Sequence, residues 1–331
     1  MDFRLELHPA NFNQKLNHED ALLLMGSCFT ENMGVKLQTH KFKTLQNPHG
    51  ILFNPLSVAD ALDQYIADRI YNSDDLFFFN ERYQSWQHHS KYSNATASIA
   101  LTEINLSSNT AHKFLKTASY LFITLGSAFV YYLTDNAPLY APNKGVANNH
   151  KAPANWFYKK LLDTDEATAI LQDIMLKLKV FNPSLKVIFT ISPVRHSREG
   201  LIDNNRSKAI LITAVHKLVE QFEQAIYFPA YELIIDDLRD YRFYAEDLVH
   251  PNYAATNYVW EKFLNVAFLE DTRILMRKIN EINAAMAHKP FNAGSEAHKS
   301  FVRMQVQKIN ELQTIYPQMD FSAELAFFNG Q

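Results

Sequence analysis

Three residues of this chain have the types that acyl transfer by a serine nucleophile requires. Ser27 follows an apolar run, residues 21–25, and Gly26, while Asp247 and His250 lie three positions apart near the other end of the chain. A serine hydroxyl is a weak nucleophile near neutral pH, so it needs an imidazole to accept its proton and a carboxylate to orient that imidazole. The pattern predicts a triad in which Ser27 attacks, His250 carries the proton and Asp247 fixes the ring.

The residues after Ser27 favour this interpretation. Phe29, Met33 and Leu37 follow at helical spacing, so the Ser27 hydroxyl is predicted at a helix N-terminus. Free backbone N–H groups and the positive end of the helix dipole would stabilise an oxyanion there. A Gly-Ser pair can also simply end a strand and cap a helix, and it is the later Asp-His pair that favours a catalytic role.

Cys28, the only cysteine, is a second candidate nucleophile for the same acid and base. Adjacent side chains at a strand end diverge, so we expect only one of Ser27 and Cys28 to face the site. A single cysteine allows no internal disulfide, as is typical of a reducing compartment. The alternation of apolar and charged residues over 1–7 predicts a strand rather than a secretory signal, and no apolar run reaches membrane-spanning length. We therefore expect a cytoplasmic protein with no membrane partner.

Apolar runs separated by helical patterns predict the elements that must position these residues. The predicted strands cover 21–25, 120–125, 185–191 and 225–228, and the predicted helices cover 54–71, 164–181, 206–222 and 252–268. This alternation is typical of a parallel sheet wrapped by helices. Ser27, Gly126, Ser192 and Pro229 come directly after the four strands, so they are expected at one edge of the sheet, where open α/β sheets bind ligands.

Several blocks of the sequence resemble the GSCFA domain family, a relative of the SGNH/GDSL hydrolases. The blocks are Gly26 to Asn32 (GSCFTEN), Asn47 to Pro55 (NPHGILFNP), Thr124 to Tyr131 (TLGSAFVY), Val146 to Pro153 (VANNHKAP), Ser192 to His196 (SPVRH) and Tyr227 to Asn252, which ends in EDLVHPN. The resemblance covers residues 20–265 and implies a three-layer α/β/α sandwich with a mainly parallel, flavodoxin-like sheet. It implies the same triad, an oxyanion donor from the Gly50 backbone, and no metal or organic cofactor.

The sequence departs from the SGNH pattern at one position. Where SGNH enzymes have Gly-x-Asn-Asp, with the asparagine holding the oxyanion, this chain has Gly126 followed by Ser127, Ala128 and Phe129. A hydroxyl or carboxamide can donate equally well, so Ser127, Asn148 and Asn149 are the candidate replacements. Losing one such donor without replacement would cost about 3 kcal/mol of transition-state stabilisation.

Other residues of the same blocks are predicted to contact the substrate. Asn148 and His150 lie in the loop after the third block, and Arg195 and His196 follow a predicted strand. A lone histidine in a loop is more often an exposed residue without a functional role, and the block resemblance is what favours a role in binding an acyl or sugar group.

The chain divides into a predicted catalytic domain, residues 1–268, and a C-terminal helical extension, residues 269–331. Within the first, residues 76–92 are strongly aromatic and predict an inserted hairpin, whose aromatics we expect to pack rather than bind. The extension shows two amphipathic patterns, consistent with a helical hairpin that covers the domain or forms a contact in a homo-oligomer.

Composition limits the classes of partner. With 32 basic and 35 acidic residues mixed along 331 positions, the chain lacks the basic bias of a nucleic-acid-binding protein. The sequence favours a serine esterase or deacylase acting on a small O-acylated compound or carbohydrate. Two alternatives stay open: an O-acyltransferase with the same triad, and a ligand-binding module on the same fold that has lost its chemistry.

Overall fold

The computed structural model describes residues 4–196, 198 and 200–330. Its centre is a five-stranded sheet with the spatial order β10-β9-β5-β1-β2, in which every neighbouring pair is parallel. The strands are β1 (Ala21–Gly26), β2 (Lys43–Gln46), β5 (Tyr120–Leu125), β9 (Lys186–Ile191) and β10 (Ala225–Tyr227). Numbered within the sheet this is the order 2-1-3-4-5 of flavodoxin-like folds.

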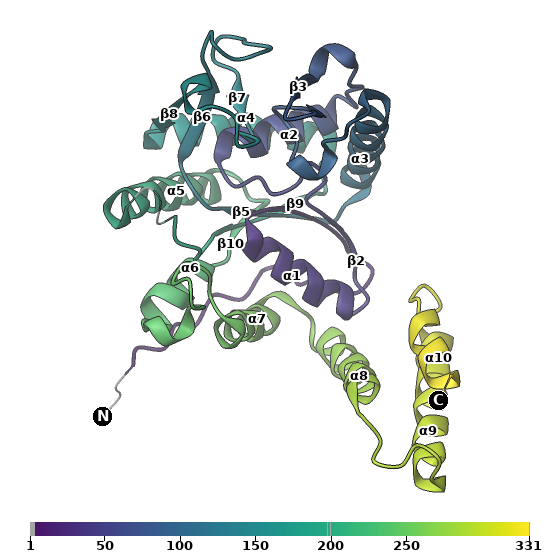
Figure 1. Cartoon of the computed structure of the whole chain (residues 1–331). Coiled ribbons are helices and arrows are strands. Elements are labelled where there is room, and N and C mark those ends of the chain that lie inside the picture. The colour runs from purple at the N-terminus through teal and green to yellow at the C-terminus, as the bar shows by residue number, and fades with distance from the viewer. Residues whose placement is uncertain (1–3, 197, 199, 331) are drawn as a thin grey trace.

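Helices cover both faces of the sheet and make three layers (Figure 1). One face packs against α2 (Pro55–Ile66), α3 (Ala97–Thr117), α4 (Thr164–Phe181) and α5 (Leu201–Gln221). The other packs against α1 (Cys28–Thr39), α6 (Ala230–Glu232), a π-helical turn (Leu233–Leu238) and α7 (Tyr253–Ala267). The protein is therefore an α/β/α sandwich, as the sequence predicts.

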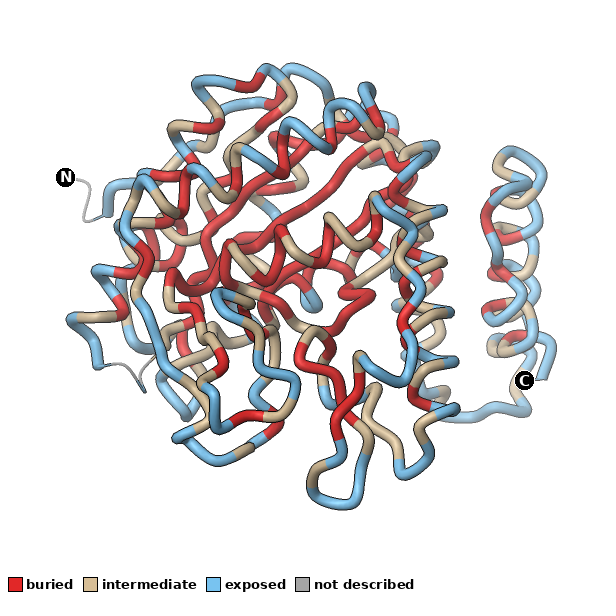
Figure 2. The backbone as a smooth tube through the Cα atoms, turned by 90° about the horizontal axis from the view of Figure 1, so that it is seen from above, coloured by how far each residue is buried: buried red, intermediate tan, exposed pale blue. Residues whose placement is uncertain are grey.

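The middle strands are apolar because both of their faces are covered. All residues of β1 and β5 are buried, and Figure 2 shows that the buried parts of the backbone run through the centre of the molecule. Leu23 contributes to the apolar cluster on one face, and its neighbours Leu22 and Leu24 contribute to the cluster on the other. Continuous apolar runs of this kind are the signature of parallel strands buried on both sides.

Two small antiparallel sheets lie beside the main one. The predicted hairpin within residues 76–92 is present as β3 (Phe77–Phe79) and β4 (Arg82–Gln84). Asn80 and Glu81 between them both have positive φ, as a tight two-residue hairpin turn requires. The other sheet, unpredicted, consists of β6 (Phe129–Leu133), β7 (Gly145–Val146) and β8 (Phe157–Leu161).

The C-terminal helices differ in number from the predicted hairpin. The described part of this extension, which ends at residue 330, contains three: α8 (Glu270–Ala287), α9 (Glu296–Ile315) and α10 (Ser322–Asn329). They share an apolar cluster of their own. The prediction missed α10, whose eight residues are too few for a clear periodic pattern. The Lys41–Glu324 ion pair ties α10 to the sandwich. The domain boundary at residue 268 stays a prediction.

The N-terminal strand prediction is wrong where it can be checked. Residues 4–7 form no strand, and residues 1–3 lie outside the described residues. Across residues 4–196, 198 and 200–330, none of the helices combines the length and the apolar composition that a membrane crossing needs.

Candidate active site

A cleft of about 580 Å³ lies at the carboxyl edge of the central sheet, next to the ends of β1, β5 and β9. After β1 the chain enters α1 on one face of the sheet, and after β5 it leads to α4 on the other, so the cleft lies at a topological switch point. The lining residues are Ser27, Cys28, Ile51, Phe53, Asn54, His89, Ser127, Phe129, Tyr131, Val146, Ala147, Asn148, Asn149, Val194, Arg195, His196, Arg198, Asp247, Val249 and His250. The fold thus brings all three predicted triad residues to one cleft.

Ser27 occupies the turn from β1 into α1. The preceding Gly26 has φ +147°, and a Cβ there would lie 2.5 Å from the Thr124 carbonyl oxygen, so only glycine fits. Ser27 caps α1, because its Oγ accepts the Phe29 N–H at 3.3 Å. Its own N–H has no hydrogen-bond acceptor in the described part of the chain, and is therefore free to stabilise an anion at this helix N-terminus.

The Ser27 hydroxyl donates to Ser192 Oγ at 2.9 Å. Ser27 is only 3% exposed, so this proton faces the protein rather than solvent. Among the described residues no hydrogen bond joins Ser27 to His250. The nucleophile and the base share a cleft, but proton transfer between them requires the hydroxyl to turn away from Ser192.

Asp247 and His250 form a pair that the loop itself assembles. One carboxylate oxygen of Asp247 accepts the N–H groups of Val249 and His250 at 2.9 and 3.0 Å, and the other accepts from His250 Nδ1 at 2.7 Å. Leu248 has φ +57°, which tightens the loop enough for these contacts. With Nδ1 engaged as a donor, Nε2 is the nitrogen left to accept a proton.

The electrostatics of this loop suit an orienting carboxylate. Hydrogen bonds from His250 and Val249 lower the pKa of Asp247 to about 2, so the group is ionised throughout the neutral range. Two backbone bonds hold the loop in place, from Ala245 N–H to the His250 carbonyl at 2.8 Å and from Arg195 N–H to the Val249 carbonyl at 3.1 Å.

Two of the predicted oxyanion donors already have partners. The Gly50 N–H donates to the Asn47 carbonyl at 2.8 Å, and Gly50 does not line the cleft. Ser127 lines the cleft, but its Oγ accepts the Phe129 N–H at 3.1 Å and lies 3.3 Å from Ser207 Oγ. The assignment of Gly50 stays a prediction that requires its turn to open.

Asn148 and Asn149 are better placed to donate. Their side-chain oxygens accept the N–H groups of His150 at 2.8 Å and Lys151 at 3.2 Å, which orients both carboxamides. Neither Nδ2 has an acceptor within the described residues, and both side chains line the cleft. An unpaired carboxamide N–H group on a cleft wall is a suitable oxyanion or substrate donor.

The predicted substrate-binding residues separate into two groups. Arg195 and His196 line the cleft, with the Arg195 guanidinium 4.2 Å from the Tyr244 ring centre. Burial lowers the pKa of His196 to about 4, so this ring is neutral at pH 7. His150 does not line the cleft: it is buried and its Nε2 lies 2.8 Å from the Ser85 carbonyl oxygen, so the fold does not bring it together with Arg195 and His196.

Cys28 lines the cleft together with Ser27, contrary to the expectation that only one of them would. Burial raises the pKa of its thiol, which reduces the thiolate fraction near neutral pH. Its environment therefore disfavours it as the nucleophile.

Sequence reasoning missed the roles of Ser192 and Lys208. Ser192 Oγ accepts a hydrogen bond from the Ser27 hydroxyl. The Nζ of Lys208 donates to the Ser192 carbonyl oxygen at 2.7 Å. The available signal for Lys208 was its place on the buried stripe of α5, one turn from Leu211. A lysine on an apolar helix face is rare enough to mark a position of interest.

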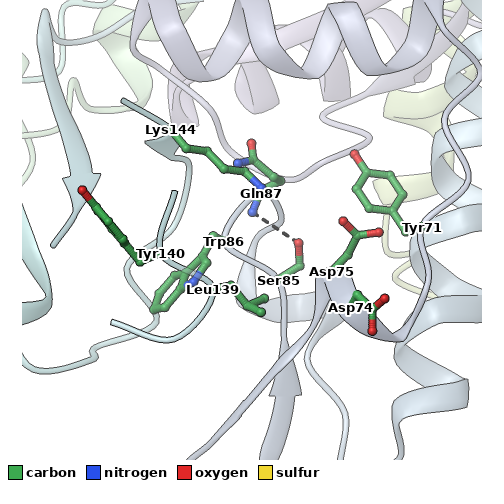
Figure 3. A pocket seen from close by; sticks show the side chains of 9 residues that line it. All are labelled: Tyr71, Asp74, Asp75, Ser85, Trp86, Gln87, Leu139, Tyr140 and Lys144. Carbon is green, nitrogen blue, oxygen red and sulfur yellow. Dashed lines mark hydrogen bonds between the residues drawn. The ribbon is translucent and has the colours of Figure 1, made fainter. Parts of the chain in front are cut away.

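A second cavity of about 240 Å³ lies beside the β3–β4 hairpin and contains none of the predicted triad residues (Figure 3). Its polar groups are partly engaged: Asp75 pairs with Arg69, and Gln87 N–H donates to Ser85 Oγ, the dashed contact in Figure 3. Within the described residues no cluster of His, Cys, Asp or Glu could hold a metal ion. The cleft that is lined by Ser27, Asp247 and His250 is therefore the candidate active site.

The fold and the cleft define an α/β/α protein with a serine and an Asp-His pair at the carboxyl edge of its sheet. Residues 21–263 match the family model described as "GSCFA family", and residues 279–331 match the model "GSCFA domain protein, C-terminal domain". The chain therefore belongs to the GSCFA family. No curated protein matches it.

Among solved structures, one that this chain matches is an acetyl xylan esterase (Est2A) from the rumen bacterium Butyrivibrio proteoclasticus. The sequences are 8% identical, the TM-score is 0.36, and the match covers 75% of this chain and 63% of that one. This chain thus corresponds to less than two thirds of that esterase's length.

Proposed function

We propose that this protein is a serine esterase or deacylase that acts on a small O-acylated compound or carbohydrate through an acyl-enzyme on Ser27. The observation that carries the proposal is the meeting in one cleft of three features. These are Ser27 at a helix N-terminus with a free N–H, an Asp247–His250 pair whose imidazole Nε2 is available, and unpaired carboxamide donors from Asn148 and Asn149.

The proposed cycle uses Ser27 and His250 in both half-reactions. Ser27 Oγ attacks the ester carbonyl carbon while its proton passes to His250 Nε2, and the carbonyl oxygen becomes an oxyanion facing the Ser27 N–H. Collapse breaks the bond to the alcohol, which leaves with the proton from His250. Water then attacks the acyl-enzyme with His250 again as base, releasing the acid and restoring Ser27. A hydroxyl acceptor in place of water would make the same cycle an acyl transfer.

A ligand-binding module without catalysis is the second candidate, and one observation favours it. The Ser27 hydroxyl donates to Ser192, not to His250, and the Gly50 N–H is occupied by Asn47. If that arrangement persists when ligand binds, the serine is not activated and the cleft only binds.

Labelling by a fluorophosphonate separates the two candidates, because it requires an activated serine. We expect stoichiometric labelling of the folded wild-type protein, turnover of p-nitrophenyl acetate, and loss of both in Ser27→Ala. Cys28→Ser is the matched control, since Cys28 is the adjacent residue and lines the same cleft. We expect this variant to keep both labelling and turnover, because Ser27 is the proposed nucleophile. Absence of labelling in folded wild-type protein would favour the binding module, and loss of labelling in Cys28→Ser would make the thiol the nucleophile.

A further inference from the structure

Helix α5 carries three buried polar side chains near its N-terminal end: Asn204, Ser207 and Lys208, which are 4%, 2% and 1% exposed. Elsewhere on the same stripe the helix presents apolar residues such as Leu211 to the core. Buried polar groups cost free energy unless they are hydrogen-bonded, so their partners indicate what they are for.

Lys208 bonds the backbone at the ends of two strands. Its Nζ donates to the Gly126 carbonyl at 2.6 Å and to the Ser192 carbonyl at 2.7 Å, directly after β5 and β9. No carboxylate of the described residues pairs with it. Burial lowers the pKa of Lys208 to about 7. Both protonation states of the amine have at least two N–H donors for the two carbonyl acceptors.

The other two side chains hold the segments that follow these strands. Ser207 Oγ accepts the Ala128 N–H at 2.7 Å and lies 3.3 Å from Ser127 Oγ. Asn204 Oδ1 accepts the His196 N–H at 2.9 Å. Ser207 therefore contacts the loop after β5, Asn204 contacts the loop after β9, and Lys208 contacts both.

These two loops separate at the cleft. The bond from Ser192 N–H to the Leu125 carbonyl, at 2.8 Å, joins the ends of β5 and β9. Beyond this bond, the loop after β5 runs through Ser127 toward β6. The loop after β9 runs to Arg195, whose N–H bonds the Val249 carbonyl in the Asp247–His250 loop. Holding both loops in place therefore positions Ser127 in the cleft wall and also positions Arg195, which bonds the loop of the acid–base pair.

We propose that Asn204, Ser207 and Lys208 form a polar brace that positions the two loops of the active site, with Lys208 as its central positioning residue. The brace acts through the backbone of Gly126 and Ser192 and does not touch the reacting atoms. Its catalytic consequence rests on the proposed function, whereas its structural consequence does not.

Lys208→Met tests the brace, since methionine keeps the length of the side chain and removes both donors. In a crystal structure of the variant we expect the Gly126 and Ser192 carbonyls to move apart relative to the wild type, and the Ser27–Ser192 contact to lengthen beyond 2.9 Å. With an active wild type we expect kcat to fall about 100-fold with little change in KM, because a small misplacement of catalytic groups acts on the transition state.

Leu211→Ala is the matched control on the same helix, as it removes buried contacts but none of these hydrogen bonds. It should lower the melting temperature and leave the kcat of the folded protein unchanged. If Lys208→Met does not fold, Ser207→Ala is measured in the same way and should shift the Ser127–Ala128 segment with a smaller loss of kcat.

Unchanged loops in the variant structure would overturn the brace, whatever the activity. So would a kcat for Lys208→Met that equals that of Leu211→Ala. A wild-type protein without turnover would contradict the proposed function instead, and the comparison of crystal structures would still decide the brace.

Discussion

The two halves of the candidate triad are held in opposite ways. Ser27 is buried at the start of α1, after a position where only glycine fits beside Thr124. Its hydroxyl also bonds Ser192, which follows β9 and lies 165 residues further along the chain. The side chains of Asp247 and His250 are 49% and 45% exposed, and hydrogen bonds within a four-residue loop fix them. Tertiary packing therefore positions the nucleophile, while local geometry assembles the acid and base.

Because Asp247 and His250 are exposed, we expect substitutions of this pair to lower activity without affecting stability. The largest loss of activity is expected for Asp247→Asn. The asparagine oxygen can keep the two backbone bonds of the loop, but its NH2 group faces His250 Nδ1 and disfavours the required tautomer. We expect kcat to fall about 10⁴-fold with an unchanged melting temperature. The measurement is p-nitrophenyl acetate turnover, with Glu246→Gln as the neighbouring control. A loss below tenfold would show that the carboxylate does not orient the base.

The next largest effect is expected when one of the candidate oxyanion donors, Asn148 or Asn149, is removed. Because the Gly50 and Ser127 groups are engaged, Asn148→Ala or Asn149→Ala should reduce kcat about 10²- to 10³-fold, the loss typical of an oxyanion donor. Each variant serves as the control for the other, since the two residues are adjacent and only the true donor should matter. Full activity in both variants would show that neither carboxamide donates to the oxyanion together with the Ser27 N–H.

The smallest effect concerns the contact between Ser27 and Ser192. If Ser192 competes with His250 for the Ser27 proton, Ser192→Ala should accelerate fluorophosphonate labelling about fivefold, the equivalent of one hydrogen bond of about 1 kcal/mol. Thr190→Val is the control, because it removes a nearby buried hydroxyl that has no partner among the described residues. Slower labelling in Ser192→Ala would mean that Ser192 supports the nucleophile instead.

The sequence predicts the middle of the fold well and its periphery poorly. The apolar runs at β1, β5 and β9 are visible because both faces of these strands are buried. The edge strand β2 has four residues that are half-buried or exposed, so it carries no apolar run. Helix α3 buries small or polar side chains such as Ala100, Ser108 and Ala111, which weakens its periodic signal.

The same contrast applies to the site. Asp247 and His250 could be predicted because their contact depends on a spacing of three residues within one loop. The bonds from Ser27 to Ser192 and from Lys208 to Gly126 span 165 and 82 residues, and no local pattern encodes them. Gly50 was assigned from the block resemblance, which does not reveal that a turn occupies its N–H.

The most direct test of the account is a crystal structure of the fluorophosphonate-treated protein. We expect the phosphonyl group on Ser27 Oγ, with His250 Nε2 within about 3.2 Å of that oxygen. An adduct on Cys28, or a modified Ser27 whose oxygen stays out of hydrogen-bond reach of His250, would contradict the claim that these two residues act together.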